Sequence, residues 1–262
     1  MQQEGYLFRS CLSEGLTALR NANIHDIGQY YIAFFQLSIG LERLMKVIII
    51  LEYAATHDLT FPTTALLRGL GHDLHELVAG VQRIQASWPS HPLSFLISST
   101  IEWEILDHLN EFAKGARYFN LDRITAHTSR VDPLRRWKFI LERIIATEHS
   151  VHEPGIAAAQ STIMCAASQC LNPLSSQEEQ VRAWQQYFEN GQMYEQGAGY
   201  ATYRVLRILD GLREVLYEVT SAAHAMANCM GIKDACVPFM TEFLSFVDAE
   251  DCQRVIDKKC WP

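Results

Sequence analysis

The chain has 262 residues, 48% of them hydrophobic and 20% charged, and its formal net charge at pH 7 is −8. This length allows a hydrophobic core for one large domain or two small ones, and the composition excludes an intrinsically disordered protein. The negative net charge excludes a protein that is basic over its whole surface, as many nucleic-acid-binding proteins are.

The spacing of apolar residues predicts helices along nearly the whole chain, and no hairpin signal separates them. In the first half, helices are expected at 6–22, 27–55, 72–85 and 93–116. A further short helix is expected to start at Thr63 or Thr64. After a polar stretch at 120–133, which predicts a loop, helices are expected at 134–149, 156–171, 177–195, 198–230 and 234–258. The predicted fold class is therefore all-α.

The domain organisation that we expect divides the chain close to a Pro-Gly pair at residues 154–155. Residues 1–150 would form one helical domain, and residues 151–262 would form a helical C-terminal region packed on it. One continuous bundle is the alternative.

Charged residues interrupt an otherwise apolar helix at Glu42 and Lys46. The two are four residues apart, which places them on one helix face in the favourable order of acid before base. An ordinary surface ion pair is one interpretation. Because apolar residues flank both, the alternative is a pair that faces a cleft or another chain.

Two further polar motifs lie at expected helix ends, at Gly71-His72-Asp73 and at Arg117-Tyr118. Gly71 is typical of a helix end, and Asp73 would lie in the first turn of the next helix, where an acid suits the helix dipole. A phosphate could bind the free N–H groups there, Arg117 offers a fork for phosphate, and Tyr118 can stack on a base. The alternative is that these residues only cap helices and pack beneath them.

The order of these motifs resembles that of the HEPN superfamily (higher eukaryote and prokaryote nucleotide-binding domains) over roughly residues 10–150. The resemblance rests on three stretches, Tyr30–Lys46, Gly71–Leu77 and Leu106–Asp122. It implies an up-and-down bundle of four or five helices that forms a homodimer, here with additional C-terminal helices. The ligand-binding candidates that it implies are Glu42, Lys46, His72, Asp73, Arg117, Tyr118 and Asp122.

Many HEPN domains are metal-independent ribonucleases of defence and toxin–antitoxin systems, with an Arg followed by four to six residues and a His. In that chemistry the His handles the proton of the ribose 2′-hydroxyl and the Arg stabilises the charge on phosphorus. No His stands at this distance after Arg117. Two other pairs fit the spacing, Arg20 with His25 and Arg143 with His149, and they are the catalytic candidates.

Positive charge is concentrated between residues 114 and 143, where eight basic and three acidic residues give a net charge of +5. The rest of the chain carries −13. Such polarity can steer an anionic ligand to one face, although a solvated surface with local ion pairs is equally consistent with it.

The location that we expect is the cytoplasm, without membrane association. The N-terminus shows no secretory signal, and the longest strongly apolar patch, at 47–51, is far shorter than the roughly 20 residues of a membrane helix.

The seven cysteines lack the close spacing of zinc sites, so reduced thiols and no metal or cofactor are expected.

Three functions remain open at this point. The favoured one is a HEPN-like module that binds RNA, a nucleotide or a protein partner, in a prokaryotic defence or toxin–antitoxin setting, because no His stands at the required distance after Arg117 and the net charge is negative. The second is a metal-independent HEPN endoribonuclease, and the third is an all-α structural or interaction protein.

Overall fold

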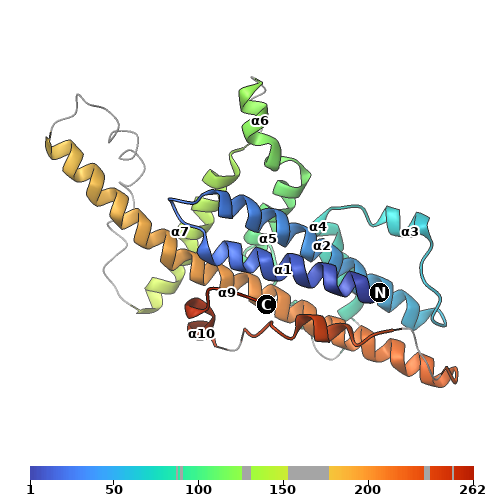
Figure 1. Cartoon of the computed structure of the whole chain (residues 1–262). Coiled ribbons are helices and arrows are strands. Elements are labelled where there is room, and N and C mark those ends of the chain that lie inside the picture. Colours follow the sequence, from blue (N-terminus) through green and yellow to red (C-terminus); the bar gives the residue numbers. More distant parts are fainter. Residues whose placement is uncertain (87, 89–90, 126–130, 153–176, 233–236, 250) are drawn as a thin grey trace.

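The computed structural model describes the chain except for residues 87, 89–90, 126–130, 153–176, 233–236 and 250 (Figure 1). The side chains of 149–152, 177–190 and 192–193 also lie outside the description. The described elements are α1 (Gln2–Asn21), α2 (Gly28–Thr56), α3 (Thr64–Gly69), α4 (Leu74–Gln85), α5 (Ile101–Lys114), the 3₁₀ helix η1 (Ala116–Tyr118), α6 (Phe119–Ile124), α7 (Pro133–His152), α9 (Gln177–Cys229), the 3₁₀ helix η2 (Met240–Leu244) and α10 (Cys252–Asp257). No strand occurs among these residues, and the prediction of an all-α fold is confirmed.

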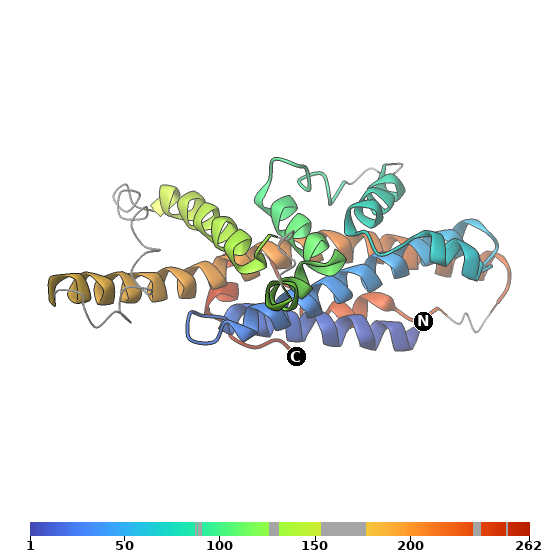
Figure 2. The same ribbon diagram turned by 90° about the horizontal axis from the view of Figure 1, so that it is seen from above.

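Three long helices, α1, α2 and α9, run side by side along the length of the bundle (Figures 1 and 2). The helices α4, α5 and α7 pack across this layer on one side, and η2 and α10 pack against α1 and α9. The short helix α6 projects away from the bundle (Figure 1). The α5–α7 pair therefore stands at the surface, supported from below by α2 and α9.

Helices α1 and α2 approach closely because glycine faces leucine at two places. A Cβ atom on Gly15 would lie 2.8 Å from Cγ of Leu37, and one on Gly40 would lie 2.7 Å from Cγ of Leu12. Both distances are too short for real carbon contacts, so any larger residue would push the two helices apart.

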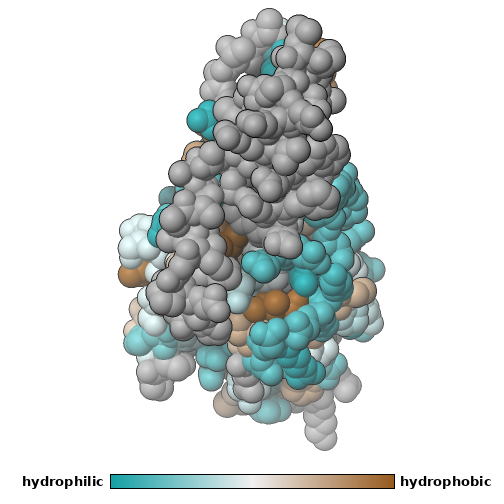
Figure 3. All heavy atoms as spheres, turned by 90° about the vertical axis from the view of Figure 1, so that its left-hand side faces the viewer, coloured by the Kyte–Doolittle hydropathy of each residue, from teal (hydrophilic) through white to brown (hydrophobic). Residues whose placement is uncertain are grey.

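A single hydrophobic core joins the N-terminal and C-terminal parts of the chain. It includes Phe34 on α2, Trp137 on α7, Leu212 on α9 and Trp261 near the C-terminus. Seen from one end, the described surface around it is mostly hydrophilic and frames a small hydrophobic area (Figure 3). A domain boundary near residue 150 stays a prediction, and the core is continuous across it.

The helix expected at 93–116 begins only at Ile101, so its first eight residues were predicted wrongly. Residues 93–100 form turns, yet Leu93 and Leu96 are buried as they would be on a helix. Side chains from α4 satisfy the backbone of this turn: Gln85 Oε1 accepts from the N–H of Leu93, and Gln82 Nε2 donates to the carbonyl of Leu96. The apolar spacing thus reflects burial without helical hydrogen bonding.

Three other helix predictions differ from the structure. The expected loop at 120–133 contains most of α6, and the helices expected at 177–195 and 198–230 are one helix, α9. Gly197 lies within α9 close to α7, where a Cβ would lie 3.2 Å from Cδ1 of Ile145, so this glycine serves packing and does not end the helix. The helix expected at 156–171 lies outside the described residues.

The C-terminal helix expected at 234–258 is wrong for most of its length. Among the described residues of this stretch, only η2 and α10 are helical, and residues 245–249 between them form a turn followed by irregular chain. Met240 in η2 and Val247 after it are both buried, and η2 packs against α1 and α9. The helical spacing of the apolar residues here therefore again reflects their burial in the core and not a helix.

Candidate functional site

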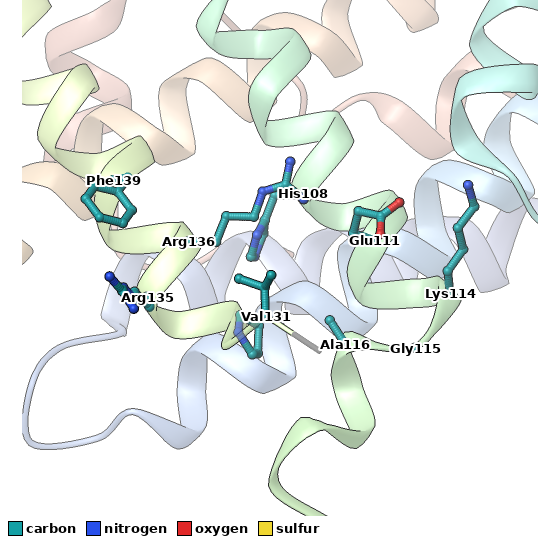
Figure 4. A pocket seen from close by; sticks show the side chains of 10 residues that line it. His108, Glu111, Lys114, Gly115, Ala116, Val131, Arg135, Arg136 and Phe139 are labelled. Carbon is teal, nitrogen blue, oxygen red and sulfur yellow. The ribbon is translucent and has the colours of Figure 1, made fainter. Parts of the chain in front are cut away.

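A pocket of about 660 Å³ lies between α5 and α7 (Figure 4). Helix α5 contributes His108, Glu111 and Lys114. These are three residues apart, so they share one face of the helix. Helix α7 contributes Arg135, Arg136 and Phe139, and the chain between the two helices closes one end with Gly115, Ala116, Val131 and Pro133. Two helical walls therefore face each other across the pocket.

His108 forms the buried back of this pocket. It is 1% exposed, and its Nε2 has no hydrogen-bond partner among the described residues. The ring lies edge-on to Phe34, with 4.5 Å between centroids. Burial, together with a smaller effect of the neighbouring Arg136, lowers the pKa of His108 to about 3. The imidazole is therefore neutral at neutral pH and keeps one unused hydrogen-bonding nitrogen.

Two of the cations in the pocket are already paired with acids. Arg136 forms an ion pair with Asp107, and Nζ of Lys114 lies 2.7 Å from Oδ2 of Asp73. The hydrogen bond to Asp73 raises the pKa of Lys114. Lys114 and Arg136 therefore already donate hydrogen bonds to carboxylates of the protein, and they have fewer donors left for a ligand.

Arg135 is the cation that remains available. Its side chain is exposed, and no hydrogen bond or ion pair holds it within the part of the chain that the structure describes. Among the described lining residues, Glu111 is the one acid beside three cations, and two of these cations are already paired with Asp73 and Asp107. A free guanidinium presents a planar fork that matches phosphate oxygens, and its positive charge attracts an anion.

Asp73 anchors the beginning of α4 beside the pocket. It is the N-cap residue, one position before the first turn in which it was expected, and Oδ1 accepts from the N–H of His75 at 2.9 Å. Burial raises the pKa of Asp73, but the hydrogen bonds from Lys114 and from His75 outweigh it and lower the pKa below its ordinary value. Asp73 is therefore a structural cap that also holds a pocket lysine.

Three of the expected ligand-binding residues meet elsewhere, at the start of the loop before α4. Oε1 of Glu42 accepts from Nζ of Lys46 and from Nδ1 of His72, each at 2.8 Å. Burial raises the pKa of Glu42, while these two hydrogen bonds lower it more strongly. Gly71, at φ +62°, provides the left-handed turn that brings His72 to α2. The cluster does not line the α5–α7 pocket.

Arg117 and Tyr118 lie on η1 and line a separate groove of about 570 Å³. The guanidinium carbon of Arg117 is 4.9 Å from the centroid of the Tyr118 ring. The other wall of this groove comes from α2, with Tyr31, Ile32 and Phe35. Asp122 lies on α6. The expected ligand-binding residues are thus distributed over three places.

The two Arg–His pairs that fit the ribonuclease spacing also lie away from the pocket. Arg20 is buried, and its Nε donates to the carbonyl of Ile256 at 2.8 Å, whereas His25 is exposed beyond the end of α1. Arg143 pairs with Glu104 on α5, and the side chain of His149 lies outside the described residues. The catalytic role of either pair stays a prediction.

No protein-family model, curated protein or solved structure matches this chain. The resemblance to HEPN domains therefore rests on the sequence motifs alone.

Among the described helices, none is both long and apolar enough to cross a membrane. Within the same residues, no group of three or more His, Cys, Asp or Glu side chains is placed to hold a metal ion.

Proposed function

We propose that this protein is a HEPN-like module that binds a nucleotide, free or within an RNA strand, in the pocket between α5 and α7. The observation that carries the proposal is the set of cations there, with the unpaired Arg135 exposed and Lys114 and Arg136 beside it. Phosphate is the group in a nucleotide that such a set recognises.

The dimensions and the apolar residues of the pocket support a ligand larger than a phosphate ion. Its volume of about 660 Å³ lies in the range of small-molecule sites. Phe139 is 57% exposed and stands one turn from Arg135 on the same face of α7. An aromatic ring beside a cation is suited to a base and its phosphate, since the base can stack while the guanidinium holds the oxygens.

Arg135→Ala should weaken the binding of a fluorescein-labelled single-stranded RNA about tenfold, because it removes the free phosphate fork. Fluorescence anisotropy over a range of salt concentrations measures this. The dependence of log affinity on log salt should also become shallower, by about one unit of slope for one lost phosphate contact. Arg68→Ala, at an exposed arginine on α3, is the matched control and should bind like the wild type.

Equal losses in both variants would show that binding follows total charge, and would contradict a site at this pocket. No binding of RNA or nucleotide by the wild type would overturn the proposal itself. The same samples, held in EDTA, test the ribonuclease alternative. Cleavage that disappears in His25→Ala or His149→Ala would favour an enzyme.

A further inference from the structure

Among the described residues, one acid lines the pocket, Glu111, and its charge helps to raise the pKa of Lys114, one turn away on α5. The side chain of Glu111 is exposed, and no hydrogen bond or ion pair to it occurs in the described part of the chain. The other acids nearby are occupied, since Asp73 holds Lys114 and Asp107 holds Arg136. Figure 4 shows Glu111 on the α5 wall, apart from Arg135 and Phe139 on the α7 wall.

This arrangement divides the pocket into two chemically different walls. An ionised carboxylate only accepts hydrogen bonds, and it repels phosphate oxygens. A phosphate group is therefore favoured beside Arg135, and the part of the ligand beside Glu111 must supply N–H or O–H donors. A simple inorganic anion is attracted by Arg135 on the first wall and repelled by the carboxylate of Glu111 on the second, where Lys114 is held by Asp73.

We infer that Glu111 selects the ligand by accepting two adjacent hydrogen bonds from an uncharged part of the nucleotide. This inference rests on the proposed nucleotide-binding function. Two parts of a nucleotide offer such a pair: the N1–H and N2–H edge of guanine, and the 2′- and 3′-hydroxyls of ribose. Adenine and uracil present donors next to acceptors, and the acceptors would face the carboxylate unfavourably.

Binding of GMP, dGMP, AMP and dAMP to the full chain, measured by isothermal titration calorimetry, separates these two sources. Recognition of the guanine edge predicts that GMP and dGMP bind at least tenfold more tightly than AMP and dAMP. Recognition of the ribose hydroxyls predicts that GMP and AMP bind at least tenfold more tightly than both deoxynucleotides. Either pattern supports the role of Glu111 only if it depends on that carboxylate.

The variant Glu111→Gln tests whether the preference depends on the carboxylate. The amide keeps the size of the side chain but replaces one acceptor by a donor, so the preferred nucleotide should bind about tenfold more weakly and the preference should shrink. Inorganic pyrophosphate should bind more tightly to this variant, because the repulsion is gone. Glu242→Gln, at an exposed glutamate on η2, is the matched control and should leave every affinity unchanged.

Equal binding of all four nucleotides, or a preference that survives Glu111→Gln, would overturn this inference while leaving nucleotide binding in place. Failure of every nucleotide and of RNA to bind would overturn the proposed function together with it. Thermal melts of both glutamine variants verify that they are folded, and an exposed conservative change should leave the melting temperature within a few degrees of the wild type.

Discussion

Replacing Glu102 by alanine should lower the free energy of unfolding by about 3 kcal/mol, the largest effect that we expect from a single charged residue. The Glu102 side chain is 4% exposed, and Oε1 lies 2.9 Å from Arg204 and 2.5 Å from Arg207 on α9. Removing the carboxylate leaves two guanidinium groups without this partner at the junction of α5 and α9. Urea denaturation followed by circular dichroism measures the loss.

A control variant removes the carboxylate of Glu102 together with one of its two arginine partners. In the double variant Glu102→Met with Arg204→Met, two apolar side chains of similar length replace the most buried pair, and part of the stability should return, since Arg207 and Glu148 each still lose a partner. A loss below about 1 kcal/mol in Glu102→Ala would show that the ion pairs at this junction behave like exposed ones.

Stability should also fall by about 2 kcal/mol between pH 7 and pH 5, because His108 stays neutral in the folded protein. Its pKa is about 3 when folded and about 6.5 when unfolded, so only the unfolded chain takes up a proton in this interval. The contribution of this histidine is complete above pH 6.5 and is lost as the pH falls toward 3. Denaturation curves at several pH values measure it.

His108→Phe isolates this contribution from that of the other histidines. No hydrogen bond to the His108 ring occurs in the described part of the chain, and its Nε2 is buried without a partner there, so a phenyl ring loses none of the described hydrogen bonds and keeps the edge-on contact with Phe34. The variant should lose about 2 kcal/mol less than the wild type between pH 7 and pH 5. The same dependence in both proteins would mean that His108 is not held neutral by burial.

The helices and their ends follow from local chemistry, and much of them could be predicted. Thr63 caps α3 as its position suggested, and Gly71 and Gly231 adopt the positive φ that a helix-ending glycine allows. The turn at 93–100 could not be predicted, since its leucines have the spacing of a buried helix. What distinguishes it is the hydrogen bonding by Gln82 and Gln85, which depends on tertiary contact.

The site was predictable only in part, for a similar reason. The resemblance grouped Glu42 and His72 among the ligand-binding candidates without predicting their contact, and the net charge of +5 between residues 114 and 143 indicated a positive face. The pocket itself depends on the packing of α5 against α7, which brings residues 108–114 to residues 135–139. Its buried member, His108, and its acid, Glu111, have no sequence signal beyond a shared helix face.

Photo-crosslinking of a single-stranded RNA containing 4-thiouridine, with the crosslinked peptides identified by mass spectrometry, tests the central claim most directly. The proposed site predicts crosslinks on both walls of the pocket, within residues 108–116 and 131–139, and their loss when unlabelled GMP competes. Crosslinks confined to the groove of Tyr31 and Tyr118, or spread over the surface without any in the pocket, would contradict it.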